Sequence, residues 1–375
     1  MEYNVMLVEG NRLVLEQLAN VIRNTEGFQL AARYQDPMDA LGQGAVFKPN
    51  LILLDVEQGS GMDLLRDFLT AFPNVPVICL GDHWQSEVAS RMVQEGARGY
   101  LVKPFTSEEL SEAVDTFGKS GMEVASQMIA FFSPKGKSGK TTLIANLAMS
   151  LAQKSGAPVG IIDADLQFGD MSVFFNLEPQ STIVEAVRDV DFLSPISLNN
   201  YFLPVTDKVK VLCGTKNPSL NDKVEISPLE KMVNMSKSLF RYVLVDIPPG
   251  FNPTSIAICE ASDITYLVAM VNGGYEAQHV RRSLEIFEDW EDYSDRVKTI
   301  FTRVTPCDIS SQQQLETMTG YPVEAIVPNE YMVVSNAADN GRMALDIEPD
   351  SQLTRSINRL ADKIIGRKRI RWDKP

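Results

Sequence analysis

Short apolar runs alternate with amphipathic stretches along the first third of the chain. The apolar runs lie at residues 5–8, 51–54, 77–80 and 99–102. Each is followed by a stretch of helical spacing, at 12–22, 62–72, 87–94 and 107–117 respectively. Such alternation predicts a parallel sheet with helices on both faces. The run Leu51–Leu54 is apolar at every position, which is typical of a strand buried on both sides.

The alternation resumes in the second part of the chain, with apolar runs at 159–162, 242–245 and 297–301 and a helical pattern at 351–365. Residues 119–126 lie between the two patterns and contain glycine, serine and charge without apolar periodicity, so they indicate a linker. A chain of 375 residues with 44% hydrophobic residues can bury two cores. The sequence therefore predicts two doubly wound α/β domains, at 1–118 and 127–375.

A glycine-bearing turn follows the apolar run that ends at Phe132 and leads into a stretch of helical spacing. Backbone N–H groups of such a turn and the positive end of the following helix point at one spot, which suits a phosphate. Lys140 adds charge at the β- and γ-phosphates, and the Thr141 hydroxyl supplies a hard oxygen for direct contact with Mg²⁺. The implied ligand is a nucleoside triphosphate. The loop consists of Lys135, Gly136, Lys137, Ser138, Gly139, Lys140, Thr141 and Thr142.

Two carboxylates, Asp163 and Asp165, follow the apolar run at 159–162. Side chains one residue apart point to the same side of an extended chain, so both can face a nucleotide. One of them can hold a metal-bound water while the other orients the attacking water. Taken by themselves, the two residues are equally consistent with solvated turn aspartates that cap a helix.

A third carboxylate, Asp246, ends the run at 242–245 and leads into a proline-rich turn. A carboxylate at the end of a strand beside a phosphate loop anchors Mg²⁺ through water. Pro248 stiffens the turn, and Gly250 lets the backbone approach the γ-phosphate.

The net charge of −14 opposes contact with polyanions, because sequence-independent binding of nucleic acid needs a dense basic face. Basic residues concentrate at 367–374, a tail that either contacts acidic lipid or a partner or is a solvated helix end. No run approaches the roughly 20 apolar residues of a membrane span, and the N-terminus lacks the layout of a signal peptide. We expect a cytoplasmic protein.

The cysteines show no spacing typical of a metal site or a disulfide framework, which indicates buried thiols. They are Cys79, Cys213, Cys259 and Cys307.

The loop at 135–142 resembles the deviant Walker A motif of the ParA/MinD family of P-loop NTPases. The resemblance implies that Lys135 reaches across a dimer interface to the partner's nucleotide; a solvated surface lysine is the alternative. The family usually has glycine where this chain has Lys137. The segment with Asp163 and Asp165 resembles the family's switch I. The resemblance makes Asp165 the residue that positions the hydrolytic water and leaves Asp163 to hold a metal-bound water. Asp246 to Gly250 resembles its Walker B motif and switch II.

The resemblance also implies a place for the base, with ATP preferred over GTP. Thr302 and Arg303 stand where the family commonly has Asn-Arg lining the adenine pocket. Pro328, Asn329 and Glu330 match a later loop of the family that packs on the base.

Ligands gather at the carboxyl ends of parallel strands, where the first domain has Glu9, Asp55, Gly81 and Lys103. This domain resembles a two-component receiver domain, which implies a flavodoxin-like five-stranded parallel sheet. Asp55 matches the family's phosphate-accepting aspartate and Lys103 its phosphate-contacting lysine. One carboxylate of the family's acidic pair is replaced by Gly10, and the switch threonine or serine is replaced by Gly81. Because aspartyl phosphorylation needs the metal, we expect an interaction module in which Asp55 and Lys103 form a structural ion pair.

A receiver-like domain joined to this ATPase resembles the TadZ and CpaE proteins of tight-adherence (Flp) pilus assembly, across almost the whole chain. The resemblance implies an ATP- and Mg²⁺-dependent homodimer that localises pilus components at the cell pole and docks them on the receiver-like domain. The alternatives are a DNA-partitioning ATPase, a membrane-positioning ATPase and a phosphorylation-gated response regulator. An iron–sulfur reductase of the same superfamily is disfavoured, because it places paired cysteines at the dimer face.

Overall fold

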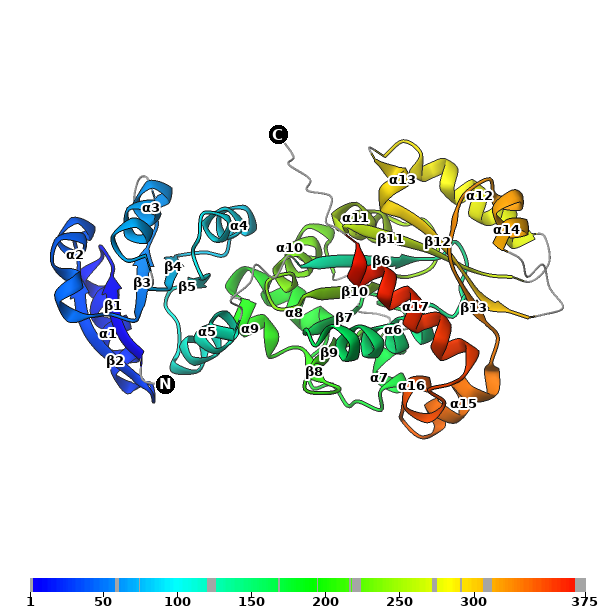
Figure 1. Cartoon of the computed structure of the whole chain (residues 1–375), viewed down its shortest axis with the longest axis horizontal. Coiled ribbons are helices and arrows are strands. Elements are labelled where there is room, and N and C mark those ends of the chain that lie inside the picture. Colours follow the sequence, from blue (N-terminus) through cyan, green and yellow to red (C-terminus); the bar gives the residue numbers. More distant parts are fainter. Residues whose placement is uncertain are drawn as a thin grey trace. The chain divides into compact units, whose positions relative to one another are not determined.

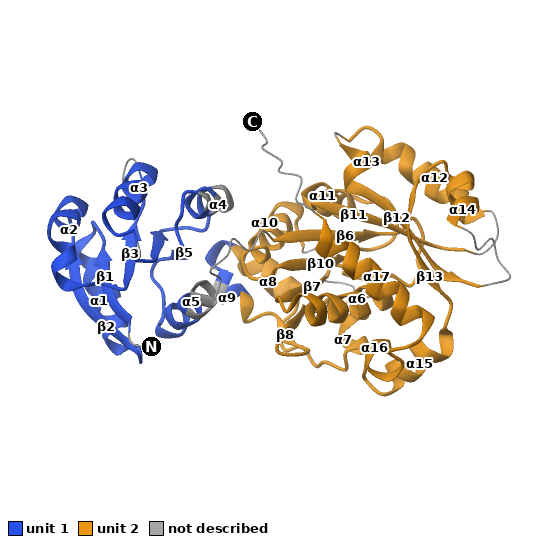
Figure 2. Ribbon diagram, viewed as in Figure 1, with its two compact units in different colours: residues 1–124, 191–198 blue, residues 125–190, 199–375 orange. Residues whose placement is uncertain are grey.

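The computed structural model describes residues 3–57, 61–73, 75–119, 126–167, 169–193, 195–215, 217, 224–271, 275–290, 292–305 and 312–367. The chain divides into two compact units (Figure 2). Unit 1 comprises Met1–Val124 and Asp191–Leu198, and unit 2 comprises Ala125–Val190 and Asn199–Pro375. The first division falls inside the predicted linker at 119–126, most of which lies outside the described residues. The short segment Asp191–Leu198 groups with unit 1, although the sequence pattern placed it inside the second domain.

Unit 1 is a five-stranded parallel sheet with helices on its faces (Figure 1). Its elements are β1 (Tyr3–Val8), α1 (Arg12–Asn24), β2 (Phe28–Tyr34), α2 (Pro37–Gln43), the 3₁₀ helix η1 (Gly44–Phe47), β3 (Leu51–Asp55), α3 (Gly61–Ala71), β4 (Val77–Gly81), α4 (Ser86–Gln94), β5 (Gly99–Val102) and α5 (Ser107–Lys119). The strand order is β2-β1-β3-β4-β5, and all pairs are parallel. The predicted flavodoxin-like fold is confirmed.

The buried strands and the edge strand of unit 1 explain what the sequence pattern found and what it missed. β3 and β4 are buried at every residue, as their continuous apolar runs predict. Asn11 begins α1, because its side-chain oxygen accepts hydrogen bonds from the N–H groups of Leu13 and Val14. The pattern missed β2, an edge strand whose residues are half-buried or exposed, so its sequence lacks an apolar run.

Unit 2 contains an eight-stranded sheet in the order β13-β12-β11-β6-β10-β7-β9-β8. Its strands are β6 (Gln127–Phe132), β7 (Val159–Asp163), β8 (Leu203–Pro204), β9 (Val209–Leu212), β10 (Tyr242–Asp246), β11 (Ile264–Met270), β12 (Val297–Val304) and β13 (Val323–Pro328). All neighbours are parallel except β8, which runs antiparallel to β9. Because β6 lies between β10 and β11, the turn after β6 meets loops from both halves of the sheet.

The helical elements that follow β6 belong to unit 2, except for the parts that fall within Asp191–Leu198, which group with unit 1. They are α6 (Lys140–Ser155), α7 (Met171–Phe174), α8 (Ile183–Asp189), the 3₁₀ helix η2 (Val190–Phe192), α9 (Pro195–Asn199), α10 (Ile226–Ser236), α11 (Pro253–Ala261), α12 (Tyr275–Phe287), α13 (Tyr293–Arg296), α14 (Gln312–Thr319), α15 (Tyr331–Asp339), α16 (Ala344–Ile347) and α17 (Gln352–Gly366). The helix predicted at 351–365 is α17. Ser351 begins it by accepting a hydrogen bond from the N–H of Thr354.

Helix α6 packs against the sheet and against α17, which also contacts the sheet at β13 (Figure 1). Leu143, Leu147 and Leu151 of α6 join Ile357 and Leu360 of α17 in one buried cluster with the strands. Ser150 also donates a hydrogen bond to Asn358 at 2.6 Å. The packing fixes the N-terminus of α6, and with it the turn that precedes it.

Among the described residues, none of the helices has both the length and the apolarity that a membrane crossing requires.

Candidate functional site

The predicted phosphate loop leaves β6 after Phe132 and enters α6 at Lys140. Two of its residues have left-handed backbone, Lys137 with φ of 65° and Gly139 with φ of 78°. No described residue accepts a hydrogen bond from the backbone N–H of Gly139 or of Lys140. Helix N-termini with unpaired N–H groups attract anions. The loop therefore has the backbone geometry of a phosphate cradle.

Lys137 occupies a conformation that glycine adopts most easily. A side chain in the left-handed region costs about 1–2 kcal/mol, so the glycine usual at this position in the resembling family has a physical basis. The Lys137 side chain is exposed.

The side chains after the loop lie close to the carboxylate that ends β10. Lys140 is buried, and its Nζ lies 3.5 Å from Asp246 Oδ1. The Thr141 hydroxyl donates a hydrogen bond to Asp246 Oδ2 at 2.8 Å. A hydroxyl and a carboxylate oxygen are hard ligands that suit Mg²⁺. The residues present therefore fit a site for a phosphate with its metal ion.

Asp163 lies opposite Asp246, because β7 and β10 pair in register at these residues. Burial raises the pKa of Asp163 well above its ordinary value, and the neighbouring charge of Asp246 raises it further. Burial also raises the pKa of Asp246, while the Lys140 charge and the Thr141 hydrogen bond oppose that rise. Two buried carboxylates side by side need added positive charge to be ionised together.

The two aspartates after β7 are placed differently. Asp163 accepts hydrogen bonds from the N–H of Met171 at 3.1 Å and from that of Asp165 at 3.3 Å, so it holds the turn between β7 and α7. Asp165 is half-exposed, and its Oδ1 accepts from the N–H of Gln167 at 3.2 Å. Asp165 is therefore the carboxylate of the two with access to solvent.

The proline-rich turn after β10 is tied to the start of the phosphate loop. The N–H of Gly250, which has φ of 85°, donates to the carbonyl of Ser133 at 2.8 Å. The Ser133 hydroxyl donates to the carbonyl of Lys135 at 2.6 Å. The Pro248 carbonyl accepts from Ser255 of α11 at 3.1 Å. Ser133 therefore links this turn to the phosphate loop by hydrogen bonds on both sides.

The residues expected to surround the base divide into two groups. Thr302 is buried, and its hydroxyl donates to the carbonyl of Ser138 in the phosphate loop. Arg303 is exposed with φ of 53°, and its Nε lies 3.6 Å from the position that a Cβ would take at Gly139. These two residues adjoin the loop.

The later segment of the expected base pocket follows β13. The Asn329 N–H donates to the Val304 carbonyl at 2.9 Å, and Pro328 is half-buried. The Glu330 carboxylate accepts from the N–H groups of Leu353 at 2.8 Å and Gln352 at 3.4 Å, at the start of α17. Its observed contacts are those of a helix cap. The loop at 328–330 is thereby anchored to α17.

Two lysines of the loop have no ion-pair partner among the described residues. Lys135 and Lys137 are exposed, and neither forms an ion pair with any residue that the structure describes. The basic tail lies outside the described residues from 368 onward; Arg367, just before it, pairs with Glu324 at 2.9 Å.

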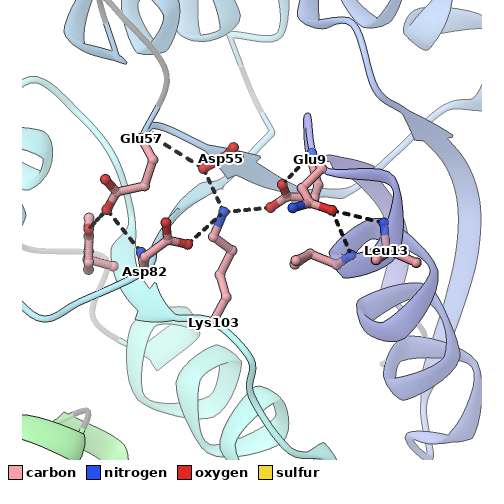
Figure 3. Close-up of polar contacts among 9 residues, drawn as sticks. Glu9, Leu13, Asp55, Glu57, Asp82 and Lys103 are labelled. Carbon is pink, nitrogen blue, oxygen red and sulfur yellow. Dashed lines mark hydrogen bonds and ion pairs between the residues drawn. The ribbon is translucent and has the colours of Figure 1, made fainter.

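The cluster of charged side chains in unit 1 has the opposite balance of charge, with one lysine among three carboxylates (Figure 3). Lys103 is buried, and its Nζ lies 2.6 Å from Glu9, 2.9 Å from Asp55 and 3.3 Å from Asp82. Burial alone would lower the pKa of Lys103, but the hydrogen bonds to Glu9 and Asp55 outweigh it and raise that pKa. The expected ion pair between Asp55 and Lys103 is present. The sequence reading missed Asp82, which lies just beyond the end of β4.

Gly81 leaves room for a tyrosine. A Cβ at Gly81 would lie 1.6 Å from the Tyr100 hydroxyl, so no side chain fits there while Tyr100 holds this place. Tyr100 is buried and its ring packs edge-on against Trp84. Its hydroxyl donates weakly to Glu57 at 3.4 Å, and burial raises its pKa. No sequence motif indicated this contact, because Gly81 and Tyr100 belong to different strands.

Two family models match the chain. One, of the ParA family and described as NUBPL iron-transfer P-loop NTPase, matches residues 124–365, and one described as response regulator receiver domain matches residues 5–115. A relative of the second part is an uncharacterized ATP-binding protein of Methanocaldococcus jannaschii, 27% identical over 64% of this chain and 88% of that protein. A relative of the first part is the transcriptional regulatory protein MctR of Rhizobium johnstonii, 28% identical over 31% of this chain and 56% of MctR. The chain thus spans about half the length of that regulator.

Solved structures share the fold of the second part. A ParA family ATPase from Chlorobium tepidum is matched with a TM-score of 0.58 and 18% identity, over 63% of this chain and 99% of that one. The septum site-determining protein MinD of Pyrococcus horikoshii, complexed with Mg-ADP, is matched with a TM-score of 0.55 and 19% identity, over 64% of this chain and 96% of that one. At these identities the likeness concerns the fold.

Proposed function

We propose that this chain, which belongs to the ParA family of P-loop NTPases, is an ATP-binding, slowly hydrolysing switch that works as a homodimer. The proposal rests above all on the surplus of positive charge at the 135–142 loop. Lys140 is held beside Asp246, while Lys135 and Lys137 are exposed without an ion pair to any described residue. Unpaired cations beside unpaired N–H groups stabilise an anion of high charge, such as a triphosphate.

Each part of the site has a role in this proposal. Lys140 and the loop N–H groups hold the β- and γ-phosphates. Mg²⁺, when bound, would be held by Thr141 and Asp246 and would neutralise charge on the phosphates. Gly250 brings the switch II turn to the start of the loop, so loss of the γ-phosphate alters both together.

Asp165 orients the attacking water in this account. Its half-exposed carboxylate supports the role. Asp163, in contrast, is buried, and its two carboxylate oxygens accept hydrogen bonds from the N–H groups of Asp165 and Met171. Asp163 thus holds Asp165 in place, in addition to its proposed contact with metal-bound water. Replacement of Asp165 by Asn is expected to preserve ATP binding and abolish phosphate release, measured by a coupled phosphate assay. If Asp165→Asn weakened ATP binding as much as it slowed phosphate release, this division of roles would be contradicted.

Lys135 makes the switch dimeric by contacting the nucleotide of the partner subunit. The nucleotide then adds contacts that exist only in the dimer, and so shifts the monomer–dimer equilibrium. Light scattering with and without ATP–Mg²⁺ tests this. We expect nucleotide to double the mass of the wild type, and Lys135→Ala to bind ATP but stay monomeric. A mass that is independent of nucleotide would contradict the switch.

The cellular role that fits this architecture best is the recruitment of tight-adherence (Flp) pilus components at the cell pole, as in proteins of the TadZ and CpaE type. A ParA-type ATPase joined to a receiver domain supports it. The receiver domain acts as the docking module. In the source organism, a chain with Lys140→Ala should fail to restore pili to a deletion strain that the wild-type chain restores. Normal piliation without the chain would overturn this role.

The receiver domain acts here without phosphorylation. Lys103 already occupies the space between Glu9 and Asp55, and Gly10 supplies no second carboxylate for a metal ion. Incubation with acetyl phosphate and Mg²⁺ should leave the mass of the chain unchanged. A gain of one phosphate that is lost in Asp55→Asn would favour a phosphorylation-gated regulator instead.

A further inference from the structure

The hydroxyl of Thr302 donates its hydrogen bond to the phosphate loop. The residue is buried near the end of β12, and its Oγ donates to the backbone carbonyl of Ser138. The carbonyl of Ala269 lies farther away, at 3.4 Å. A hydroxyl has one hydrogen to donate, so Thr302 cannot at the same time donate one to a base.

The contact fixes the orientation of one peptide unit in the loop. The Ser138 carbonyl and the Gly139 N–H belong to the same planar trans peptide, so they point in opposite directions. Because the carbonyl is held toward Thr302, the Gly139 N–H points away from it. No described residue accepts a hydrogen bond from this N–H.

The surroundings keep this peptide from turning over. Gly139 has φ of 78° and is followed directly by α6, whose Leu143 N–H donates to the Gly139 carbonyl at 3.0 Å. Thr302 Oγ and Arg303 Nε lie 3.8 and 3.6 Å from the position of a Cβ at Gly139, so β12 adjoins the loop at this residue. The peptide is held at its carbonyl by β12 and at the next residue by the helix.

We infer that Thr302 is a positioning residue that orients the Gly139 N–H toward a bound phosphate, and that it does not read the base. The inference rests on the proposed binding of nucleotide by the 135–142 loop. It assigns Thr302 a contribution common to every ligand that carries the polyphosphate, whatever its base.

Thr299 provides a matched control on the same strand. It is also a buried threonine whose hydroxyl donates to a backbone carbonyl, that of Pro322 at 2.7 Å. Pro322 lies outside the phosphate loop. Thr299→Val therefore removes the same kind of hydrogen bond without touching the Ser138 carbonyl.

The test measures dissociation constants of the full chain for ATP, GTP and inorganic tripolyphosphate. Thr302→Val should raise all three by about tenfold, because the Gly139 N–H is then no longer held toward the phosphate and its charge-assisted hydrogen bond is weakened. The ratio of ATP to GTP affinity should stay at its wild-type value. Thr302→Ser keeps the hydroxyl and should restore most of the affinity, and Thr299→Val should leave all three constants unchanged. Thermal melting of each variant shows that the folded chain is being compared.

Two results would overturn the inference. In one, Thr302→Val changes the ratio of ATP to GTP affinity and leaves tripolyphosphate binding unchanged, which would make Thr302 a base contact. In the other, Thr302→Val and Thr299→Val weaken all ligands equally, which would reduce the effect to general stability. Failure of the proposed function looks different, because the wild-type chain itself would then bind none of the three ligands.

Discussion

Two clusters of charged side chains, one in each domain, combine the same residue types but differ in their balance of charge. Both lie at the carboxyl ends of parallel strands and both bring a lysine to aspartate. In the receiver domain, Lys103 lies within 3.3 Å of three carboxylates, those of Glu9, Asp55 and Asp82. In the ATPase domain, Lys140 meets one carboxylate at 3.5 Å, and Lys135 and Lys137 have no ion pair to any described residue.

The difference distinguishes a lysine with a structural role from lysines that are available to a ligand. Burial of a lysine requires compensating partners, and Lys103 has more negative charge around it than it can neutralise. The phosphate loop has the reverse imbalance, with cations and N–H groups in excess. A lysine and an aspartate at the ends of parallel strands therefore do not by themselves define an active pocket; the balance of charge around them does.

Removal of the receiver lysine is expected to give the largest effect on stability. Lys103→Met leaves Glu9 and Asp55 buried without a cation, at a cost of about 3–5 kcal/mol. Hydrogen exchange of peptides from β1 and β3 measures it. Arg66→Met, which removes an exposed pair with Glu95, is the control and should change little. Equal effects of the two variants would show that the Lys103 cluster is not structural.

The pH dependence of the same cluster has a definite sign. The pKa of Lys103 is raised in the folded state above its ordinary value of 10.5. Its contribution to stability is therefore fully present below pH 10.5 and is lost as pH rises through the folded value. The difference in stability between Lys103→Met and the wild type should therefore stay constant from pH 7 to pH 9 and shrink above pH 10.5. A difference that grows above pH 10.5 would contradict this account.

Removal of the ATPase lysine should act on binding. Lys140→Ala is expected to weaken ATP binding by about hundredfold, or about 3 kcal/mol, because a buried charge-assisted contact to phosphate is lost. Lys154 lies on the exposed part of the same helix and pairs with Asp362 at 2.7 Å. Lys154→Ala therefore serves as the control. Calorimetric titration compares them. Unchanged affinity in Lys140→Ala would place the nucleotide elsewhere.

A methyl group at Gly81 tests whether Tyr100 fills the space beside this residue. Gly81→Ala should destabilise the domain by about 1–3 kcal/mol through overpacking. In a Tyr100→Ala background the same change should cost almost nothing more, as a double-mutant cycle by urea unfolding would show. Gly42→Ala, in a helix with open space around it, is the control and should be neutral or stabilising. Additive costs at Gly81 and Tyr100 would contradict the contact.

The smallest effect is expected at Lys137. Lys137→Gly should relieve left-handed strain of about 1 kcal/mol, and thermal melting should show a slightly higher midpoint. Lys137→Ala keeps the strain and removes only the charge. If both variants lower the affinity for ATP, the charge contributes to binding; if the melting midpoint of Lys137→Gly falls, the strain argument is wrong.

The sequence predicted most of the fold, because buried strands such as β3 and β4 are continuous apolar runs and the helices after them carry apolar residues at helical spacing. It predicted less where tertiary contacts decide. The edge strand β2 lacks an apolar run, and the grouping of Asp191–Leu198 with unit 1 has no local signal.

The same limit applies to the two sites. Motif spacing predicted the loop, Asp246 and the pair of Asp55 with Lys103. It could not predict that Thr302 binds the Ser138 carbonyl, that Glu330 caps α17 or that Tyr100 fills the space beside Gly81. These contacts join residues on different elements, and their side-chain types have several possible uses.

Three cysteines are buried thiols, as the sequence indicated. They are Cys79, Cys213 and Cys259, and burial raises the pKa of Cys79 and of Cys259 to about 12. Cys307 lies outside the described residues.

Calorimetric titration of the full chain with ATP–Mg²⁺ tests the central claim most directly, namely that the 135–142 loop of this chain holds a triphosphate. The account predicts saturable binding with one nucleotide per chain and much weaker heats with adenosine. Folded protein that takes up no adenine nucleotide at millimolar concentration would contradict it.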